Sequence, residues 1–497
     1  MMQLYTAQDS KQCDAQLIAG GIPAFELMQR AAKRVFEELQ EMQSDRFVQS
    51  KVLVLVGSGN NGGDGLLVAK MAMNSGMPVT VISLKPLEMK TPESQEALAQ
   101  AQAANVPFQL LDDAIIFNDA LVVDALLGTG FNGELREDLA ALIQRVNQSS
   151  CEVVAVDVPS GLDANTGAVQ SVAIKARATV SFIIKKRGLY TANGADYSGR
   201  RLFDALVTDA ELPLYREAVA QLKRPVEVLF LDQLKHNLPQ RLQNSHKGHN
   251  GHCVLIGGSL GMSGAIILAA EACYRAGAGL VTVITEPQTA VALNARLPEA
   301  MTAIHANDID QALSRATCVG IGPGLAINAW AKDLLGKVAS LAVPVVLDAG
   351  ALTLLGNDKK MAKPEWVITP HPKEAAMLLG SDTLNVQQDR FKSVKSLSEG
   401  YHCVAVLKGS GSLISNATAD QTWLCNKGNP GMSVGGMGDI LTGLIAGLMS
   451  QGLAPFFAAK LGVELHAEAG DLQVKRFGQI GLLPQDMCLT IKELMNT

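Results

Sequence analysis

Residues 51–65 read KVLVLVGSGNNGGDG, and this stretch decides the fold. Its first six residues form an apolar run that is typical of a strand buried on both faces of a parallel sheet. The glycines that follow predict a turn from this strand into a helix, where backbone amides can approach a phosphate and the helix N-terminus adds partial positive charge. A plain tight turn is the alternative, but it does not need two Asn and an Asp.

Residues 57–62 also fit the pattern G-x-G-x-x-G. The dinucleotide sites of ordinary redox enzymes further require an acidic residue about 20 positions on, at the end of the second strand, where it holds a ribose. Here the second strand ends in Ser83-Leu84-Lys85. Ordinary redox-cofactor binding is therefore not favoured.

Similar apolar runs recur along the chain, separated by stretches with helical periodicity. In the first half they occupy residues 78–83, 120–123, 153–156 and 179–184. This βαβ rhythm predicts an open, doubly wound parallel sheet. A second series follows a break that contains Pro213 and Pro225, with runs at residues 252–256, 280–284, 318–321, 343–347, 366–369 and 403–407. We therefore expect two three-layer αβα domains, at residues 1–212 and 227–497, joined by a linker at residues 213–226.

The composition agrees with two packed domains, because 497 residues exceed the length of about 250–300 at which one core usually stops growing. A hydrophobic content of 48% argues against disorder, and a net charge of −6 with 4% aromatic residues disfavours a nucleic-acid-binding surface. No basic and apolar leader opens the sequence, and no apolar run is long enough for a membrane span. The eight cysteines form no C-x-x-C and are typical of thiols in a reducing compartment. We expect a cytoplasmic protein that binds neither nucleic acid nor membrane.

Two aspartates of the first half, Asp124 and Asp157, each end a buried strand and precede a glycine-containing loop. Because the carboxyl ends of parallel strands share one edge of the sheet, both should face the crevice beside residues 57–65. The oxygen atoms of Asn61, Asp124 and Ser160 would suit a hard cation. Asp157 is the leading acid–base candidate, since a second carboxylate nearby would raise its pKa. A helix cap or turn is the simpler role for a single such aspartate.

The run KKRG at residues 185–188 ends the next strand. It could meet a phosphate, but a solvated rim is equally expected, so these residues are not among the candidate site residues.

The most specific feature of the second half is GNPGMSVGGMGD at residues 428–439, which precedes a helical stretch. Its glycines can present backbone amides at the helix N-terminus to a phosphate that is being transferred. Asp439 can accept the proton of a substrate hydroxyl as that hydroxyl attacks phosphorus, although it could also only complement the helix dipole. No G-K-S/T follows, which excludes phosphate-loop NTPases. The stretch KGSGS at residues 408–412 predicts a second loop in contact with a nucleotide.

Together these motifs resemble those of the bifunctional NAD(P)H-hydrate repair enzymes, in which an epimerase is joined to an ADP-dependent dehydratase. The first half carries GSGNNGGDG (57–65), VDALLGTGFNG (123–133) and VDVPSGLDA (156–164). The second half carries HKGHNGHCVLIGGS (246–259), GIGPGL (320–325), TPHPKEA (369–375), KGSGS (408–412) and GNPGMSVGGMGD (428–439). The resemblance covers essentially the whole chain, and it implies a Rossmann-like N-terminal domain, a ribokinase-like C-terminal domain and a homo-oligomer.

The resemblance also implies site residues. In the first half, hydrated NAD(P)H would contact Asn60, Asn61, Gly62, Gly63, Asp64, Gly128, Thr129, Gly130, Phe131, Asn132, Gly133, Glu134 and Asp157. Potassium would be held by Asn61, Asp124 and Ser160. In the second half, the hydrated substrate would contact Gly324, His371, Pro372, Lys373, Glu374, Ala375, Ala376, Met377 and Asp439. ADP, with magnesium, would contact Lys408, Gly409, Ser410, Gly411, Ser412, Asn429, Pro430, Gly431, Met432, Ser433, Val434, Gly435, Gly436, Met437 and Gly438.

Three positions depart from the pattern that the family leads us to expect. Met437 stands for Thr in GGTGD, Lys373 for Gly in TPHPGE, and Gly350 for the second Asp of DADAL. The glycines and Asp439 remain, so we expect activity. The loss of a carboxylate at Gly350 leaves ligand affinity and cation handling open.

The expected function is repair of hydrated nicotinamide cofactors. The first domain would interconvert the R and S forms of hydrated NAD(P)H, and the second would dehydrate the S form with ADP, giving NAD(P)H, AMP and phosphate. Asp157 and Asp439 would be the acid–base groups. Two other functions stay compatible with the residues: a ribokinase-type kinase for a small molecule, and a module whose Rossmann-like domain binds a ligand without catalysis.

Overall fold

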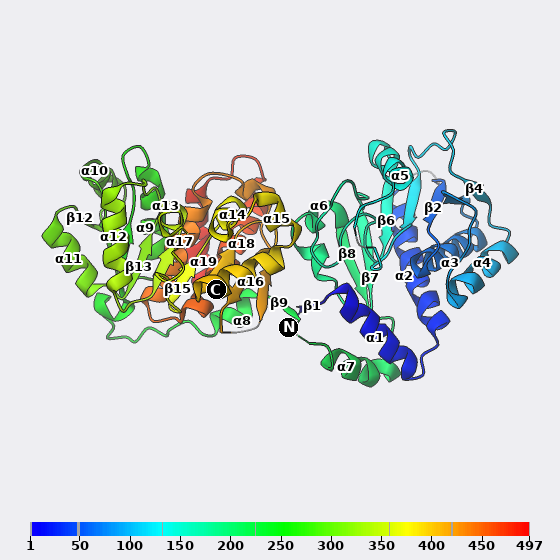
Figure 1. Ribbon diagram of the computed structural model, residues 1–497, viewed down its shortest axis with the longest axis horizontal. Helices are drawn as coiled ribbons and strands as arrows, with labels where there is room; N and C mark the ends of the chain where they lie inside the picture. The colour runs from blue at the N-terminus through cyan, green and yellow to red at the C-terminus, as the bar shows by residue number, and fades with distance from the viewer. Residues whose placement is uncertain are drawn as a thin grey trace. The chain divides into compact units, whose positions relative to one another are not determined.

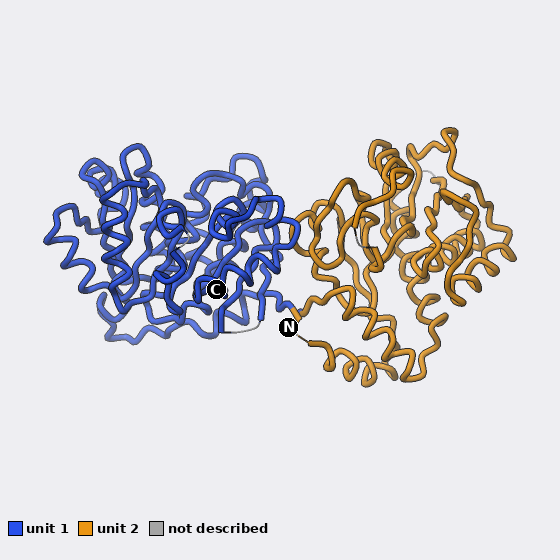
Figure 2. Tube along the Cα trace, in the orientation of Figure 1, with its two compact units in different colours: residues 1–2, 226–497 blue, residues 3–225 orange. Residues whose placement is uncertain are grey.

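A computed structural model of the protein describes residues 2–46, 50–131, 133–223, 225–356, 358–418 and 421–496. The chain divides into two compact units, an N-terminal unit of residues 3–225 and a C-terminal unit of residues 226–497 with the first two residues (Figure 2). Each unit is a largely parallel sheet with helices, which confirms the predicted fold class. Much of the segment predicted as a linker is helix α7 (Leu212–Ala220), because Pro213 stands in its first turn, where proline begins a helix instead of breaking it.

The N-terminal sheet has the order β4-β3-β2-β5-β6-β7-β8, with every neighbouring pair parallel. Since β3 and β4 lie on one side of β2 and all later strands on the other, the strand order reverses between β2 and β5, where an open α/β sheet forms its ligand crevice. The strands are β2 (Val52–Val56), β3 (Val79–Ser83), β4 (Phe108–Leu110), β5 (Leu121–Ala125), β6 (Glu152–Val156), β7 (Ala178–Phe182) and β8 (Arg200–Asp204); a short β1 (Gln3–Leu4) precedes them.

Both faces of this sheet are covered by helices (Figure 1). Val52, Val54 and Val56 of β2 belong to a hydrophobic cluster with α2 and α3, whereas Leu53 and Leu55 join a second cluster with α5. The continuous apolar run therefore reflects burial on both faces, as predicted. The helices are α1 (Ala7–Ala19), α2 (Ala24–Ser44), α3 (Asn60–Asn74), α4 (Pro92–Ala103), α5 (Glu137–Gln148), α6 (Gly194–Ser198) and α7, with 3₁₀ turns at η1 (Arg187–Tyr190) and η2 (Asp209–Glu211).

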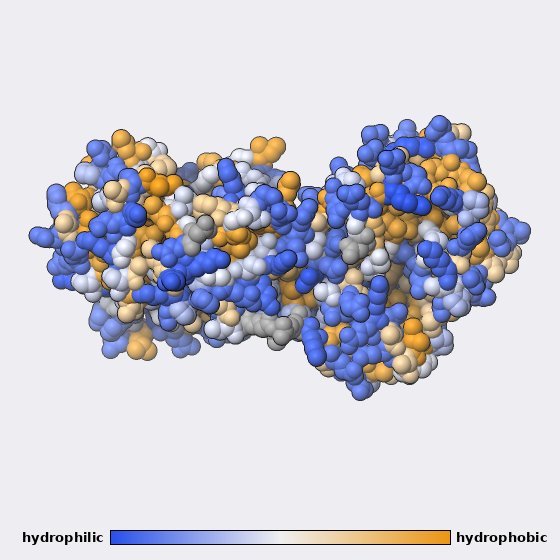
Figure 3. Space-filling view, viewed as in Figure 1, coloured by the Kyte–Doolittle hydropathy of each residue, from blue (hydrophilic) through white to orange (hydrophobic). Residues whose placement is uncertain are grey.

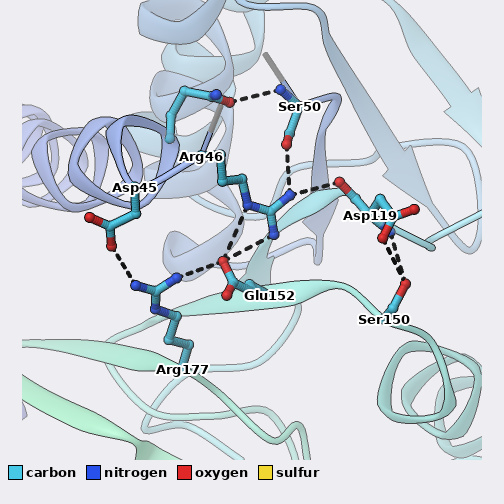
Figure 4. Close-up of polar contacts among 8 residues, drawn as sticks. Asp45, Arg46, Ser50, Asp119, Ser150, Glu152 and Arg177 are labelled. Carbon is cyan, nitrogen blue, oxygen red and sulfur yellow. Dashed lines mark hydrogen bonds and ion pairs between the residues drawn. The ribbon is translucent and has the colours of Figure 1, made fainter. Parts of the chain in front are cut away.

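A charged network links residues at the amino ends of β5, β6 and β7 (Figure 4). Glu152, the first residue of β6, accepts hydrogen bonds from Arg46 at 3.0 Å and from Arg177 at 2.7 Å. Arg46 also donates to the Asp119 carbonyl before β5, and Arg177 pairs with Asp45. Burial alone would raise the pKa of Glu152, but the two guanidinium groups lower it below its ordinary value.

Glu152→Gln should lower the stability of the N-terminal unit by about 1 kcal/mol at neutral pH, because two arginines lose their shared charged acceptor. A carboxylate whose pKa is depressed by folding stabilises the fold above its ordinary pKa and loses that effect as pH falls through the lowered value. Thermal inactivation should therefore separate wild type from variant at neutral pH and bring them together in acid. Equal stability at neutral pH would contradict the prediction.

Within residues 226–497, the C-terminal sheet runs β9-β18-β17-β16-β15-β14-β13-β10-β11-β12. All pairs are parallel except β16 with β17 and β17 with β18. Its strand order reverses between β10 and β13, which again creates a crevice at the carboxyl edge. The strands are β9 (Val226–Val228), β10 (His252–Ile256), β11 (Leu280–Ile284), β12 (Met301–Ala303), β13 (Cys318–Ile321), β14 (Val345–Leu347), β15 (Trp366–Ile368), β16 (Val404–Leu407), β17 (Ser412–Asn416) and β18 (Thr422–Cys425).

Helix α17 lies at the centre of the C-terminal unit, packed against α9 and α18. Most of its side chains are buried, which agrees with its apolar sequence. The helices are α8 (Leu231–Lys235), α9 (Ser263–Arg275), α10 (Pro287–Arg296), α11 (Ala306–Arg315), α12 (Ala329–Ser340), α13 (Ala349–Leu355), α14 (Pro372–Leu379), α15 (Thr383–Gln388), α16 (Arg390–Tyr401), α17 (Met437–Ser450), α18 (Pro455–Phe477) and α19 (Pro484–Asn496), with 3₁₀ turns at η3 (Lys247–Asn250) and η4 (Pro430–Met432).

In the view of Figure 3, hydrophilic residues cover most of the visible surface, and hydrophobic residues form scattered groups among them. Within the part of the chain that the structure describes, no helix combines the length and the apolar character needed to cross a membrane.

Candidate active sites

The predicted cation ligands of the N-terminal unit come together around the backbone of Leu127. Asp124, the residue before the last in β5, is fully buried and accepts hydrogen bonds from the Ser160 amide at 2.7 Å and from the Ser160 hydroxyl at 2.6 Å. The Leu127 amide donates to Ser160 Oγ at 3.0 Å, and Asn61 Nδ2 donates to the Leu127 carbonyl at 2.9 Å. Burial raises the pKa of Asp124 to about 6, although its hydrogen bonds with Ser160 and Leu126 lower it.

Asp157, the predicted acid–base residue, follows β6 in a backbone conformation that is rare for residues with a side chain. Its φ is 65°, and its amide is fixed by a hydrogen bond of 2.8 Å to the Val180 carbonyl. Strained residues of this kind cluster at functional sites. Asp157 Oδ1 accepts hydrogen bonds from the Phe182 amide at 3.1 Å and from Lys186 Nζ at 2.5 Å.

Lys186, which the sequence suggested could lie on a solvated rim, is buried beside Asp157 instead. Only 1% of its side chain is exposed, and Nζ also donates to the Phe182 carbonyl at 2.6 Å. The residue is not on a free loop, because Lys186 pairs with Tyr5 in an isolated β-bridge. The ion pair therefore belongs to the site.

Asp64 and Asp14 extend this charged cluster from α3 and α1. Burial raises the pKa of Asp64 well above its usual range, and the charges of Asp157 and Asp14 raise it further, while Lys186 opposes them. Burial likewise raises the pKa of Asp14, with Lys186 again acting in the opposite direction. Asp64 was predicted from its motif, whereas nothing in the sequence around Asp14 marked it.

The remaining predicted substrate residues of this unit lie on the loops after β2 and β5. Asn60 and Asn61 open α3, where Asn60 Oδ1 accepts a hydrogen bond from Thr91 at 2.5 Å. Gly128 lies directly against the side chain of Asn61, 3.2 Å from the position a Cβ would take. Asn132 lies outside the described residues.

In the C-terminal unit, Asp439 occupies the first turn of α17, after Gly436 with φ 102°. Lys408 Nζ donates to Asp348 Oδ1 at 2.7 Å, and the Thr442 hydroxyl donates to Asp348 Oδ2 at 3.0 Å. Asp348 Oδ2 and Lys408 Nζ lie 3.4 Å and 3.3 Å from where a Cβ of Gly438 would stand. Glycine at 438 thus lets a carboxylate and a lysine approach the turn that carries Asp439.

Asp439 is placed to exchange a proton near neutral pH. Burial, followed by the charge of Asp348, raises its pKa to about 7, while Lys408 opposes them. Asp348 ends β14 as Asp124 and Asp157 end their strands, but it was considered only as part of the motif around Gly350. The strand-end signal could have found it.

The predicted segment of residues 371–377 begins α14 with a capping box. His371 Nδ1 accepts hydrogen bonds from the amides of Lys373 and Glu374, and Glu374 Oε2 accepts one from the His371 amide at 2.8 Å. Glu374 Oε2 also lies 3.9 Å from Lys408 Nζ, which links this segment to the site. Ala375 and Ala376 are buried in the core, whereas Lys373 and Met377 are exposed.

Gly350, one of the three departures, is required by its surroundings. A Cβ at this position would stand 2.1 Å from the Leu325 carbonyl oxygen, so the loop after β13 closes onto α13. A side chain at 350 would push this loop away from α13. The second departure, Met437, is buried as the first residue of α17, and its backbone is hydrogen-bonded to His466.

These observations define a two-unit α/β protein of enzyme type, with aspartates gathered at the carboxyl edge of each sheet and, in its C-terminal unit, glycine-rich turns suited to phosphate. Residues 253–493 match the family described as NAD(P)H-hydrate dehydratase, and residues 24–188 match the YjeF-related protein N-terminus. The bifunctional NAD(P)H-hydrate repair enzyme of Coxiella burnetii is 39% identical over 100% of both chains. The enzyme of that name from Escherichia coli is 39% identical over 96% of this chain and 90% of its own. The chain belongs to the family of bifunctional NAD(P)H-hydrate repair enzymes.

Solved structures match the C-terminal unit. The ADP/ATP-dependent NAD(P)H-hydrate dehydratase of Bacillus subtilis, crystallised with ATP and Mg²⁺, is 28% identical with a TM-score of 0.50, and covers 55% of this chain and 98% of its own. A ribokinase-like superfamily protein of Enterococcus faecalis is 31% identical with a TM-score of 0.50, over 55% of this chain and 95% of its own. The prediction of a ribokinase-like C-terminal fold is confirmed.

Proposed function

We propose that the N-terminal unit interconverts the R and S epimers of hydrated NAD(P)H, and that the C-terminal unit dehydrates the S epimer with ADP. The observation that carries the second assignment is Asp439, with its pKa raised to about 7, standing in the first turn of a buried helix behind a glycine-rich segment. A base and a set of backbone amides at one helix N-terminus suit phosphoryl transfer to a hydroxyl.

The dehydration proceeds in two steps, transfer of a phosphoryl group to the hydroxyl and then elimination of phosphate. Asp439 takes the proton of the C6 hydroxyl, and the hydroxyl oxygen attacks the β-phosphorus of ADP, releasing AMP. The C6–O bond then breaks, and the departing phosphate takes the proton from C5 as the C5–C6 double bond returns, so that hydrogen phosphate is released. Lys408, held by Asp348, lies beside the same turn and offsets the negative charge that gathers there.

The epimerisation needs an acid and a base in one site. Asp64, whose pKa is raised well above its usual range by burial and by the carboxylates of Asp157 and Asp14, can protonate the C6 hydroxyl so that it leaves as water, with the lone pair of the ring nitrogen forming an iminium. Asp157, oriented by its ion pair with Lys186, can take a proton from the water that adds to the other face. Proton return from Asp157 to Asp64 resets the pair.

The residues around Leu127 suit potassium. Within the described residues, the donors to Asp124 are a hydroxyl and two backbone amides, so a buried carboxylate is met by neutral groups only. A monovalent cation would balance this charge, with Asn61, Asp124 and Ser160 as its protein ligands. Potassium bound there would fix the loops that hold the substrate.

Magnesium fits the C-terminal site as an ion carried by the nucleotide. Among the described residues, no three histidine, cysteine or carboxylate side chains are grouped to hold a metal ion. Mg²⁺ often binds through substrate phosphates and one or two carboxylates. Asp348 is the nearest carboxylate for that role, and the ion would neutralise phosphate charge.

The dehydratase should gain activity as pH rises. A base must be ionised, so kcat/KM for the S epimer at saturating ADP should increase through pH about 7 and level off above it. Initial rates across the neutral range test this expectation. A rate that falls with pH over the same range would contradict the role of Asp439 as the base.

The experiment that separates this function from a ribokinase-type kinase follows the products. Mixed hydrate epimers are incubated with the protein and either ADP or ATP, and restored NADH, AMP and phosphate are quantified. We expect one AMP and one phosphate for each NADH when ADP is used. A stable phosphorylated hydrate, with no NADH restored, would favour the kinase. Cytoplasmic location and a homo-oligomer remain part of this proposal.

A further inference from the structure

Helix α18 packs against the glycine-rich segment of residues 428–439, which is proposed to contact ADP. Lys427, just before this segment, pairs with Glu468 and lies 3.4 Å from the buried Glu464. Met432, in the middle, packs so closely on Gly470 that a Cβ there would stand 2.5 Å from its sulfur. The segment is therefore held along much of its length by one helix.

The most specific of these contacts comes from Asp471. Its Oδ2 accepts a hydrogen bond of 3.0 Å from the Gly428 amide, and its Oδ1 accepts one of 2.8 Å from Asn429 Nδ2. The two carboxylate oxygens of Asp471 therefore accept hydrogen bonds from two consecutive residues of the loop. Gly428 has a φ of 99°, so the chain turns sharply where Asp471 holds it.

The charge of the carboxylates in this row is offset in part by Lys427. Glu464, Glu468 and Asp471 are spaced along one face of α18, and the ammonium group of Lys427 contacts the first two. The hydrogen bonds to Asp471 come from an amide and a carboxamide, which orient the loop without placing another charge in it.

We infer that Asp471 is a positioning residue for ADP. By accepting hydrogen bonds from Gly428 and Asn429, it fixes the path of the chain along which the following glycines present their amides to the nucleotide. This inference rests on the proposed function of the C-terminal unit, and it adds to that function a residue on α18 outside the motifs. Asp471 acts through the loop and does not touch the reacting atoms.

Asp471→Asn is the sharpest test, because it keeps the shape and turns one of the two acceptors into a donor that faces an N–H group. Asp471→Ala, which removes both acceptors without introducing an opposing donor, is the second variant. ADP binding is measured on the full chain by isothermal titration calorimetry without hydrate, followed by KM and kcat for the dehydratase and the epimerase rate. The matched control is Glu493→Gln on α19, which removes a carboxylate bonded to Arg476 of α18, away from the loop.

We expect Asp471→Asn to weaken ADP binding and raise KM for ADP by about tenfold or more, with a smaller effect in Asp471→Ala, where no donor opposes the N–H groups of the loop. KM for the hydrate, the epimerase rate and the melting temperature should change little, and the control should bind ADP as the wild type does. Normal ADP affinity in a folded Asp471→Asn variant would overturn the inference. Failure of the wild type itself to bind ADP would instead overturn the proposed function.

Discussion

Asp439→Asn should reduce the rate of ADP-dependent dehydration by about 10³-fold, within the range that a positioned general base supplies. The carboxamide keeps the size of the side chain but cannot accept the hydroxyl proton. Asp348 does not replace it, because its two oxygens accept hydrogen bonds from Lys408 and Thr442. Restored NADH absorbance with the S epimer and saturating ADP measures the loss.

The same variant should keep epimerase activity, which serves as the control for folding. Its stability should also not fall. A carboxyl group whose pKa is raised by folding stabilises the protein below its ordinary pKa and loses that contribution as pH rises through the raised value, about 7 for Asp439. Above neutral pH, an uncharged Asn should therefore be tolerated at least as well as Asp. Dehydration at the wild-type rate by this variant would exclude Asp439 as the base.

Asp157→Asn should reduce epimerisation by about 10²-fold or more and leave dehydration of the S epimer unchanged. The change removes the group that accepts the proton from water, and it also leaves the buried ammonium group of Lys186 with only the Phe182 carbonyl among the acceptors described above. Exchange between the R and S forms, followed by chromatography without ADP, measures the effect.

Lys186→Met should lower epimerisation to a similar degree, because Asp157 would lose the ion-pair partner that orients its carboxylate. Lys185→Met is the matched control, since Lys185 is the adjacent lysine and is not the partner of Asp157. Normal epimerisation in Lys186→Met would show that the ion pair supports only the fold.

The strands at the buried centre of each sheet could be predicted from the sequence, whereas several strands toward the ends of the strand order could not. Val52–Val56 of β2 are buried on both faces and so form an apolar run. All three residues of β4 (Phe108–Leu110) are exposed, and its sequence FQL carries no such signal. The hairpin of β17 and β18 begins at Ser412, inside a motif that was interpreted as a loop. Short strands toward the ends of a sheet depend on their neighbours for pairing, and local periodicity does not predict that pairing.

In the candidate sites, too, some residues could be predicted from the sequence and others could not. Asn61, Asp124 and Ser160 could be grouped in advance, because strand ends of a parallel sheet share one edge. Lys186 could not be assigned, because its burial depends on how the chain turns after β7 and pairs with Tyr5. Gly350 looked like a lost ligand, and only the approach of the Leu325 carbonyl explains why glycine stands there.

The assignment of epimerisation to the N-terminal unit and dehydration to the C-terminal unit is tested most directly by mixing two single variants, Asp157→Asn and Asp439→Asn. With mixed hydrate epimers and ADP, Asp157→Asn alone should stop near the amount of S epimer present at the start, and Asp439→Asn alone should restore almost no NADH. Together in one tube they should convert the whole mixture, because each supplies the unit that the other lacks. Complete conversion by Asp157→Asn alone, or no gain on mixing, would contradict the assignment of one activity to each unit.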